Sequence, residues 1–135
     1  MPRQKSRAGA APGKGPSQRQ LRVGEMIRHR LAELLARGDI HDDVIAGHMI
    51  TIPEVRLSPD LRMATVYVLS HGTDVRPVLA ALERNKRFIR GQVSEAVNLK
   101  FAPDLRFRFD ESFAEAARIE AILASPKVRQ DTGRD

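Results

Sequence analysis

The amino-acid sequence predicts an α+β fold, a two-layer sandwich in which helices cover one face of a three-stranded sheet. Three observations support this class. Apolar residues recur at helical spacing in residues 17–37, two runs rich in β-branched residues flank the turn Ser58-Pro59-Asp60, and LRFRF at 105–109 alternates strictly. A chain of 135 residues fits one such domain. We place it at residues 17–124, between a disordered basic arm (1–16) and a flexible tail (125–135).

The first helix is predicted from Ser17 to Arg37 by its start and stop signals. Ser17 and Gln20 form the S-x-x-Q pattern of a capping box, and Gly38 supplies the left-handed residue that ends many helices. One face of this helix is apolar, and it consists of Val23, Ile27, Leu31, Leu34 and Leu35.

Two extended runs, MITIPEVRL and LRMATVYVL, predict a β-hairpin. The segment before them, residues 38–47, is expected to be a loop with little regular structure. The apolar positions are even before Pro53 (Ile50, Ile52) and odd after it (Val55, Leu57). Because proline cannot donate to a strand ladder, we expect a bulge or an edge position there.

Helical periodicity returns at residues 75–97. In one uninterrupted helix Lys86 would fall in the middle of the apolar stripe, and a buried unpaired ammonium is costly. We therefore predict a helix interruption at Asn85, Lys86 and Arg87 that turns Lys86 toward solvent, since asparagine is a poor interior helix former and tolerates a left-handed step. The alternative is one long helix with a snorkelling lysine.

Pro103 is expected to end the second of these helices. The strand that follows should bury its apolar residues and expose its charged ones, that is, Leu105, Phe107 and Phe109 against Arg106 and Arg108. Residues 112–123 predict a short C-terminal helix. The resulting order, α-β-β-α-α-β and a short helix, is that of a K-homology domain of the bacterial type (type II), whose nucleic-acid surface lies near the junction of two consecutive helices.

Composition excludes several classes of protein. The chain has no cysteine, which excludes disulfide frameworks, thiol catalysis and iron–sulfur clusters. No run approaches the ~18 apolar residues of a membrane span, and no secretory signal is expected. The net charge is +6, from 23 Lys and Arg against 17 Asp and Glu. Such a surplus predicts a polyanion partner, usually nucleic acid, and the simpler alternative is a surface charged for solubility.

The positive charge is unevenly distributed along the chain. Residues 1–20 carry five Lys and Arg and no acid; this arm either samples phosphates or serves only as a solubilising tail. Residues 75–100 carry six basic residues against Glu83 and Glu95, whereas residues 38–72 are richer in acids. An uneven field suits a binding face better than a uniformly charged surface does.

K-homology domains clamp RNA phosphates with a GxxG loop, in which small residues let backbone N–H groups approach closely. No two of the nine glycines of this chain are three residues apart, so GxxG is absent. If the domain binds RNA, it must rely more on side-chain charge than on a glycine-lined cradle of amides.

The sequence resembles the ribosome-binding factor A family of bacterial small-subunit maturation factors over about residues 17–124. Three stretches carry the resemblance: RVGEMIRHRLAELL, VRLSPDLRMATVYV and RFIRGQVSEAVNLKFAPDLRFRFDES. The family has a K-homology-like fold in which a kink, commonly Ala-x-Gly, replaces GxxG. That kink falls here on Asn85, Lys86 and Arg87, so neither small residue is present.

The resemblance implies a role in ribosome biogenesis. It implies a protein that binds the free small (30S) ribosomal subunit, assists late maturation and processing of 16S rRNA, and is not itself a nuclease. We expect it to be cytoplasmic and monomeric.

Shape- and phosphate-directed docking onto ribosomal RNA is the working hypothesis for its mechanism. The predicted RNA-binding residues are Arg76, Arg84, Lys86, Arg87, Arg90, Lys100, Arg106 and Arg108. With few aromatic residues for base stacking, sequence-specific reading of single strands is not expected. The competing hypothesis is a protein-interaction module whose basic surface serves only for steering.

No catalytic constellation, cofactor motif or metal motif is recognisable in the sequence. The nearest approach to a metal cluster is the segment with His41, Asp42, Asp43 and His48. It lacks a recognised ligand spacing, and a solvated acidic loop is the simpler interpretation. We therefore expect no enzyme, no metal site and no cofactor.

Overall fold

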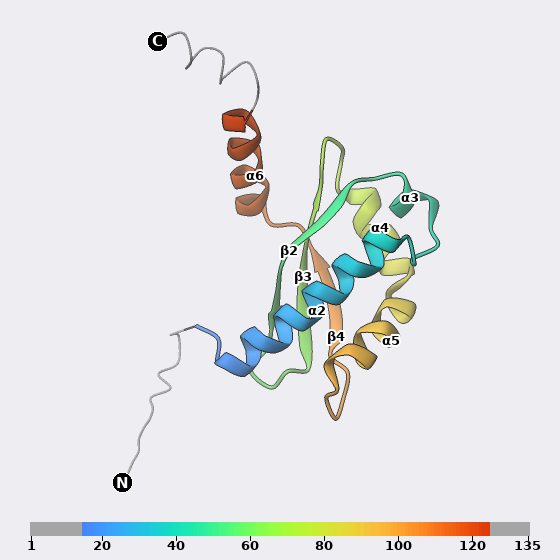
Figure 1. The fold of residues 1–135 in the computed structure, drawn as a ribbon, viewed down its shortest axis with the longest axis vertical. Coiled ribbons are helices and arrows are strands. Elements are labelled where there is room, and N and C mark those ends of the chain that lie inside the picture. The colour runs from blue at the N-terminus through green and yellow to red at the C-terminus, as the bar shows by residue number, and fades with distance from the viewer. Residues whose placement is uncertain (1–14, 125–135) are drawn as a thin grey trace.

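The computed structural model describes residues 15–124 and confirms the predicted order of elements, with one short helix added (Figure 1). The elements are α2 (Gln18–Arg37), α3 (Asp43–Ala46), β2 (Ile50–Leu57), β3 (Met63–Ser70), α4 (Arg76–Arg84), α5 (Lys86–Val97), β4 (Asp104–Arg108) and α6 (Glu111–Ala124). The expected tail and all but residues 15 and 16 of the expected arm lie outside the described residues.

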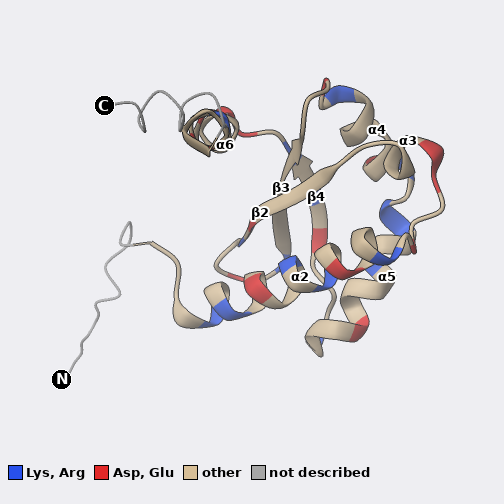
Figure 2. Ribbon diagram, turned by 45° about the horizontal axis from the view of Figure 1, so that its top comes forward, with Lys and Arg blue, Asp and Glu red and all other residues tan. Residues whose placement is uncertain are grey.

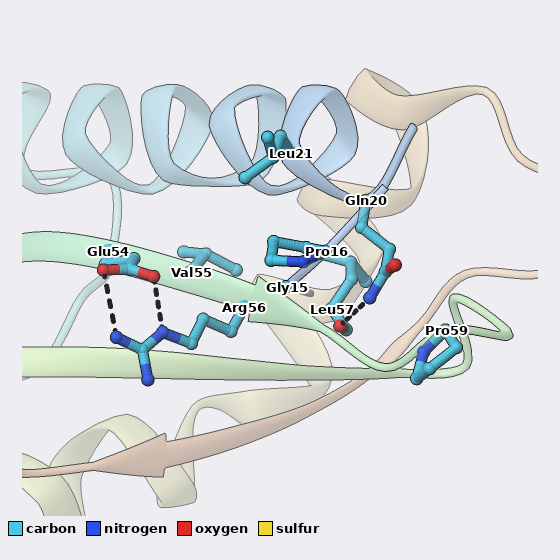
Figure 3. A pocket seen from close by; sticks show the side chains of 9 residues that line it. All are labelled: Gly15, Pro16, Gln20, Leu21, Glu54, Val55, Arg56, Leu57 and Pro59. Carbon is cyan, nitrogen blue, oxygen red and sulfur yellow. Dashed lines mark hydrogen bonds and ion pairs between the residues drawn. The ribbon is translucent and has the colours of Figure 1, made fainter. Parts of the chain in front are cut away.

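Helix α2 begins and ends where the sequence predicts. The Ser17 hydroxyl accepts a hydrogen bond from the Gln20 amide at 3.1 Å, and the Gln20 side chain accepts one from the Ser17 amide at 2.8 Å, which completes the capping box. Gly38 ends the helix in the left-handed conformation, with φ 70°. The Gln20 side chain also donates to the Leu57 carbonyl at 2.9 Å and thereby joins the start of α2 to the end of β2 (Figure 3).

Helix α3 corrects the expectation that residues 38–47 lack regular structure. Asp42 has an extended backbone, and its carboxylate accepts a hydrogen bond from the Val44 amide at 2.9 Å, which is the geometry of a helix N-cap. Ile45 in this single turn is buried in the core. The turn is therefore stabilised by its cap and by burial, two effects that its short length hides in the sequence pattern.

The three strands form a mixed sheet in the order β2-β3-β4, with β2 antiparallel and β4 parallel to the central β3. The register of β2 against β3 shifts between Thr51 and Glu54, so the predicted bulge at Pro53 is confirmed. The extra residue reverses which side of the strand faces the helices, and Ile52 and Val55 are therefore both buried.

Helices α2, α4 and α5 cover one face of the sheet, and the opposite face is open to solvent (Figure 1). The core lies between these two layers. Its fully buried large side chains include Ile27, Leu31, Leu34, Val66, Val68, Leu82, Ile89, Val93 and Leu105. Helix α6 extends away from the sandwich, contains no buried residue and touches the open face of the sheet through Phe113, whose ring lies 5.4 Å from that of Tyr67.

Two boundaries near the end of the domain differ from the prediction. Helix α5 ends at Val97 rather than at Pro103, because Asn98 adopts the left-handed conformation there (φ 50°, ψ 42°). The predicted burial of Phe109 is wrong, since its side chain is 42% exposed. Strand β4 ends at Arg108 and the chain turns into α6, so this ring does not continue the buried face of the strand.

Helix α2 lies so close to β2 that there is no room for a side chain at Gly24. A Cβ atom at Gly24 would lie 2.5 Å from the carbonyl oxygen of Val55. A Cβ atom at Gly91, which lies within α5, would meet nothing within 4 Å. A side chain would therefore clash at Gly24 but not at Gly91, and substitution by alanine at each position distinguishes the two.

We expect Gly24→Ala to destabilise the fold by about 1–3 kcal/mol, because repulsion from the β2 backbone exceeds the gain in helix propensity. Gly91→Ala is the matched control and should stabilise the fold by about 0.5–1 kcal/mol, because alanine is the better helix former and displaces nothing. Urea denaturation of the three proteins measures both changes. A Gly24→Ala protein as stable as the control would contradict this close packing.

Candidate nucleic-acid interface

The predicted helix interruption is confirmed, with Asn85 between α4 and α5. The backbone of Asn85 is not left-handed, since its φ is −100° and its ψ is 11°. Instead, its backbone N–H donates to the carbonyls of Ala81 and Leu82, and its side-chain amide donates to Ala81 at 2.8 Å. The Asn85 carbonyl accepts the first hydrogen bond of α5, from the Ile89 amide at 3.0 Å. One residue therefore ends one helix and starts the next without a loop.

Asp42 contacts this junction from the start of α3. Its carboxylate accepts hydrogen bonds from the Asn85 side chain at 2.9 Å and from the Arg84 guanidinium at 3.0 Å, although only 12% of the Asp42 side chain is exposed. Burial acts to raise the pKa of Asp42, but the hydrogen bonds from Asn85, Arg84 and the Val44 amide together lower the pKa below its ordinary value. Asp42 is therefore an anion at neutral pH, and it pairs with Arg84, one of the predicted RNA-binding residues.

Two further residues at the interruption also have partners within the protein. Lys86 is half-buried at 29% exposure and its ammonium lies 2.7 Å from Glu83, so the interruption does not turn it fully to solvent as predicted. The i,i+3 spacing across the break brings this acid within reach of the lysine. Arg90 donates to the carbonyls of Ala102 and Pro103, each at 3.2 Å, and fastens α5 to the chain that leads into β4.

Arg87 differs from its three basic neighbours. It is exposed, and within residues 15–124 its guanidinium has no acidic partner. These four cations border a shallow groove of about 650 Å³, and Figure 2 shows Lys and Arg gathered where α5 begins. The small residues Gly91, Ser94 and Ala102 also line the groove, with Glu83 and Asp104 as its acids.

The other predicted contacts lie in separate places. Arg76, at the opposite end of α4, pairs with Asp74 at 2.7 Å. Lys100 lies over the Phe101 ring, 5.5 Å from its centroid. Arg106 and Arg108 are exposed on the open face of the sheet, as predicted. The structure thus gathers four of the eight predicted residues at one groove, namely Arg84, Lys86, Arg87 and Arg90.

Sequence reasoning missed a second group of side chains on the open sheet face. The Arg56 guanidinium lies 5.1 Å from the centroid of the Tyr67 ring, and the Phe113 ring lies 5.4 Å from the same ring. The signal that could have found the first pair is the hairpin register, which sets Arg56 opposite Thr65 and Glu54 opposite Tyr67. The position of Phe113 depends on how α6 leaves the sheet, which the sequence pattern does not show.

The described residues contain few other features of a functional site. Within residues 15–124, no group of three or more His, Asp or Glu side chains is placed to hold a metal ion. No described helix is long and apolar enough to cross a membrane. A hollow lies between the start of α2 and the end of β2 (Figure 3). The charged residues among those that line it are Glu54 and Arg56, and these two pair with each other at 2.5 Å.

Fold and site together define a K-homology-like α+β domain, with a basic helix junction in place of a GxxG loop. A sequence model described as ribosome-binding factor A matches residues 19–123. Ribosome-binding factor A of Methylorubrum extorquens is 61% identical over 87% of this chain and 81% of that protein, and that of Afipia carboxidovorans is 57% identical over 100% of this chain and 96% of that protein. The crystal structure of ribosome-binding factor A from Thermus thermophilus, at 24% identity, matches with a TM-score of 0.56 over 66% of this chain and 93% of that one. The chain belongs to the ribosome-binding factor A family.

Asp42→Asn tests the contact between α3 and the helix junction. Asparagine can still cap α3 but loses the charge that pairs with Arg84. Because the folded state lowers the pKa of Asp42 below its ordinary 3.8, the carboxylate stabilises the fold above that pH and the stabilisation is lost as the pH falls further. We expect the wild type to be more stable than the variant at neutral pH, and this difference to shrink below about pH 4.

Urea denaturation at neutral and acidic pH measures both proteins. Asp43→Asn is the control, because it removes the neighbouring, exposed carboxylate and should produce no comparable difference. A stability difference between wild type and Asp42→Asn that is unchanged at acidic pH would show that the charge of Asp42 is not what stabilises the junction.

Proposed function

We propose that this protein binds the free small (30S) ribosomal subunit through its RNA and assists the late maturation and processing of 16S rRNA. It acts as a non-catalytic monomer in the cytoplasm. Family membership supports the ribosome as partner. The basic groove supports RNA as the part of the ribosome that is contacted, because exposed cations bind phosphates irrespective of base sequence. The observation that carries this assignment is Arg87, a cation at the groove without an acidic partner in the described residues.

The cations of the groove are not equivalent as phosphate ligands. Arg87 can bind a phosphate without losing an ion pair with any residue of the part of the chain that the structure describes. Arg84 and Lys86 are engaged by carboxylates, so a phosphate must compete for them. The small residues of the groove leave space for a sugar-phosphate backbone to approach α5. Recognition therefore depends on the shape of the RNA and on its phosphates, with Arg87 as the leading contact.

Arg87→Glu should weaken binding to purified small subunits by about tenfold or more, because it replaces a charge-assisted hydrogen bond by repulsion. Arg22→Glu is the matched control, since Arg22 is an exposed arginine of α2 and its reversal changes the net charge equally. Co-sedimentation at several salt concentrations measures both. The slope of log affinity against log salt should fall by about 0.7–0.9 for each lost phosphate contact. Equal losses in the two variants would mean that only net charge matters, which contradicts the assigned groove.

The wild-type protein should sediment with free small subunits in preference to assembled ribosomes, and complete RNA digestion should release it. The measurement is sedimentation of the mixture before and after nuclease treatment, with bovine serum albumin as a protein that should stay in the supernatant. A protein that remains bound after digestion would contradict binding through RNA and would favour docking onto a ribosomal protein.

A further inference from the structure

The open face of the sheet carries two rows of side chains that cross all three strands. The register aligns Arg56, Thr65 and Arg106 in one row, and Glu54, Tyr67 and Arg108 in the next. Neighbouring strands are about 4.8 Å apart, and successive outward residues of one strand are roughly 6.6 Å apart. The fold therefore gathers three arginines and a tyrosine from three separate segments onto one small surface.

Tyr67 lies at the centre of a stack of flat groups. The Arg56 guanidinium is 5.1 Å from the centroid of its ring, within the range of a cation–π contact, and the Phe113 ring lies at 5.4 Å with an interplanar angle of 53°. Glu54 pairs with Arg56 and restrains its guanidinium (Figure 3). The Arg56 side chain remains 56% exposed. An exposed guanidinium plane fixed beside an aromatic ring is a surface on which a nucleic-acid base stacks.

Arg106 and Arg108 lie beside this stack and are both exposed. Among the described residues, neither guanidinium pairs with an acidic side chain, and Arg108 donates only to the Phe107 carbonyl, at 2.9 Å. Asp104 is the first outward-facing residue of β4, and its carboxylate accepts a hydrogen bond from the Leu105 amide at 2.9 Å. Two neighbouring arginines without carboxylate partners complement the phosphates of a chain whose bases lie on the stack.

We propose that this open face is a second RNA-binding surface, which holds single-stranded RNA. Bases stack on the exposed guanidinium of Arg56, which lies against the Tyr67 ring, and phosphates bind Arg106 and Arg108. A single strand is the ligand because its bases are accessible, whereas a duplex conceals them between its strands. The surface lies across the sheet from α5, so the domain can contact two RNA segments at once. Its test requires only the purified protein and does not depend on the proposed function.

The first test concerns the two arginines of β4. It measures the affinity of the protein for a fluorescein-labelled decamer of uridylate, by fluorescence anisotropy at low salt. Arg106→Gln/Arg108→Gln should weaken binding about tenfold or more and lower the salt slope by about 1.4, since each single-strand phosphate contact contributes about 0.7. Arg19→Gln/Arg22→Gln removes the same charge from the exposed side of α2 and is the control. It should weaken binding less than twofold. Equal effects of the two double variants would overturn the proposal.

The second test measures stacking at Tyr67. Tyr67→Phe keeps the ring and should bind the decamer like the wild type, whereas Tyr67→Leu should lose about fivefold or more, because Arg56 then lacks the ring that holds its guanidinium in place for a stacked base. Photocrosslinking to a decamer that contains 5-iodouridine gives a readout without mutation. Mass spectrometry should find the crosslink at Tyr67. Equal binding by the two variants, or crosslinks confined to α4 and α5, would overturn the proposal.

Two comparisons separate this surface from the groove and from simple charge attraction. Arg87→Glu, which should impair binding to small subunits, should weaken decamer binding no more than the α2 control does. If the β4 variant binds the decamer normally while Arg87→Glu loses the subunit, this inference fails and the proposed function stands. Displacement of the decamer by decaglutamate at equal charge would show an unspecific anion site or an acidic protein segment as the occupant, and would also overturn the proposal.

Discussion

The layer of helices must bury two apolar segments against one face of the sheet without burying the cations between them. A continuous helix through residues 76–97 would place Lys86 within the apolar stripe of Val78, Leu82, Ile89 and Val93, and an uncompensated buried ammonium is more costly than a lost helical turn. Asn85 removes the conflict by ending α4 and starting α5 with its own backbone and side-chain hydrogen bonds. The helices α4 and α5 therefore meet at Asn85, and the basic groove lies at this break.

The same junction explains why a count of basic residues overestimates the number of cations that are available to a phosphate. Arg84, Lys86 and Arg76 pair with Asp42, Glu83 and Asp74, respectively. Arg90 donates to carbonyls of the segment that precedes β4. The Arg76–Asp74 pair is exposed and contributes little to stability, so a phosphate can replace that carboxylate at modest cost, whereas Asp42 is largely buried and loses more if Arg84 is drawn away. These contacts still make the paired cations less available to a phosphate than Arg87 is. The proposed affinity for RNA is therefore assigned to the arginines that the fold leaves without partners in its described part.

The features that the sequence predicted correctly depend on neighbouring residues. The capping box at Ser17, the stop at Gly38 and the bulge at Pro53 each follow from a few side chains close together in the chain. The features that it missed depend on contacts between distant residues. Helix α3 is stabilised by burial of Ile45, Asp42 meets Arg84 across 42 positions, and Phe109 leaves the core because α6 turns away. For the candidate site, the sequence pattern identified basic residues that share one groove but not their partners within the protein, and RNA binding by these residues stays a prediction.

A helix junction of Asn85, Lys86 and Arg87 differs from a GxxG loop in how it can attract a phosphate. In a GxxG loop, backbone N–H groups act at short range, need close approach and lose no side-chain entropy. Long cationic side chains reach further, but they lose rotamer freedom on binding, and their attraction is screened within about 8 Å at physiological salt. In our proposal, phosphate binding at this junction therefore depends more on ionic strength and less on close fit than binding at a GxxG loop does. Such a surface suits the irregular outline of folded RNA, where phosphates are dense and base edges are largely hidden.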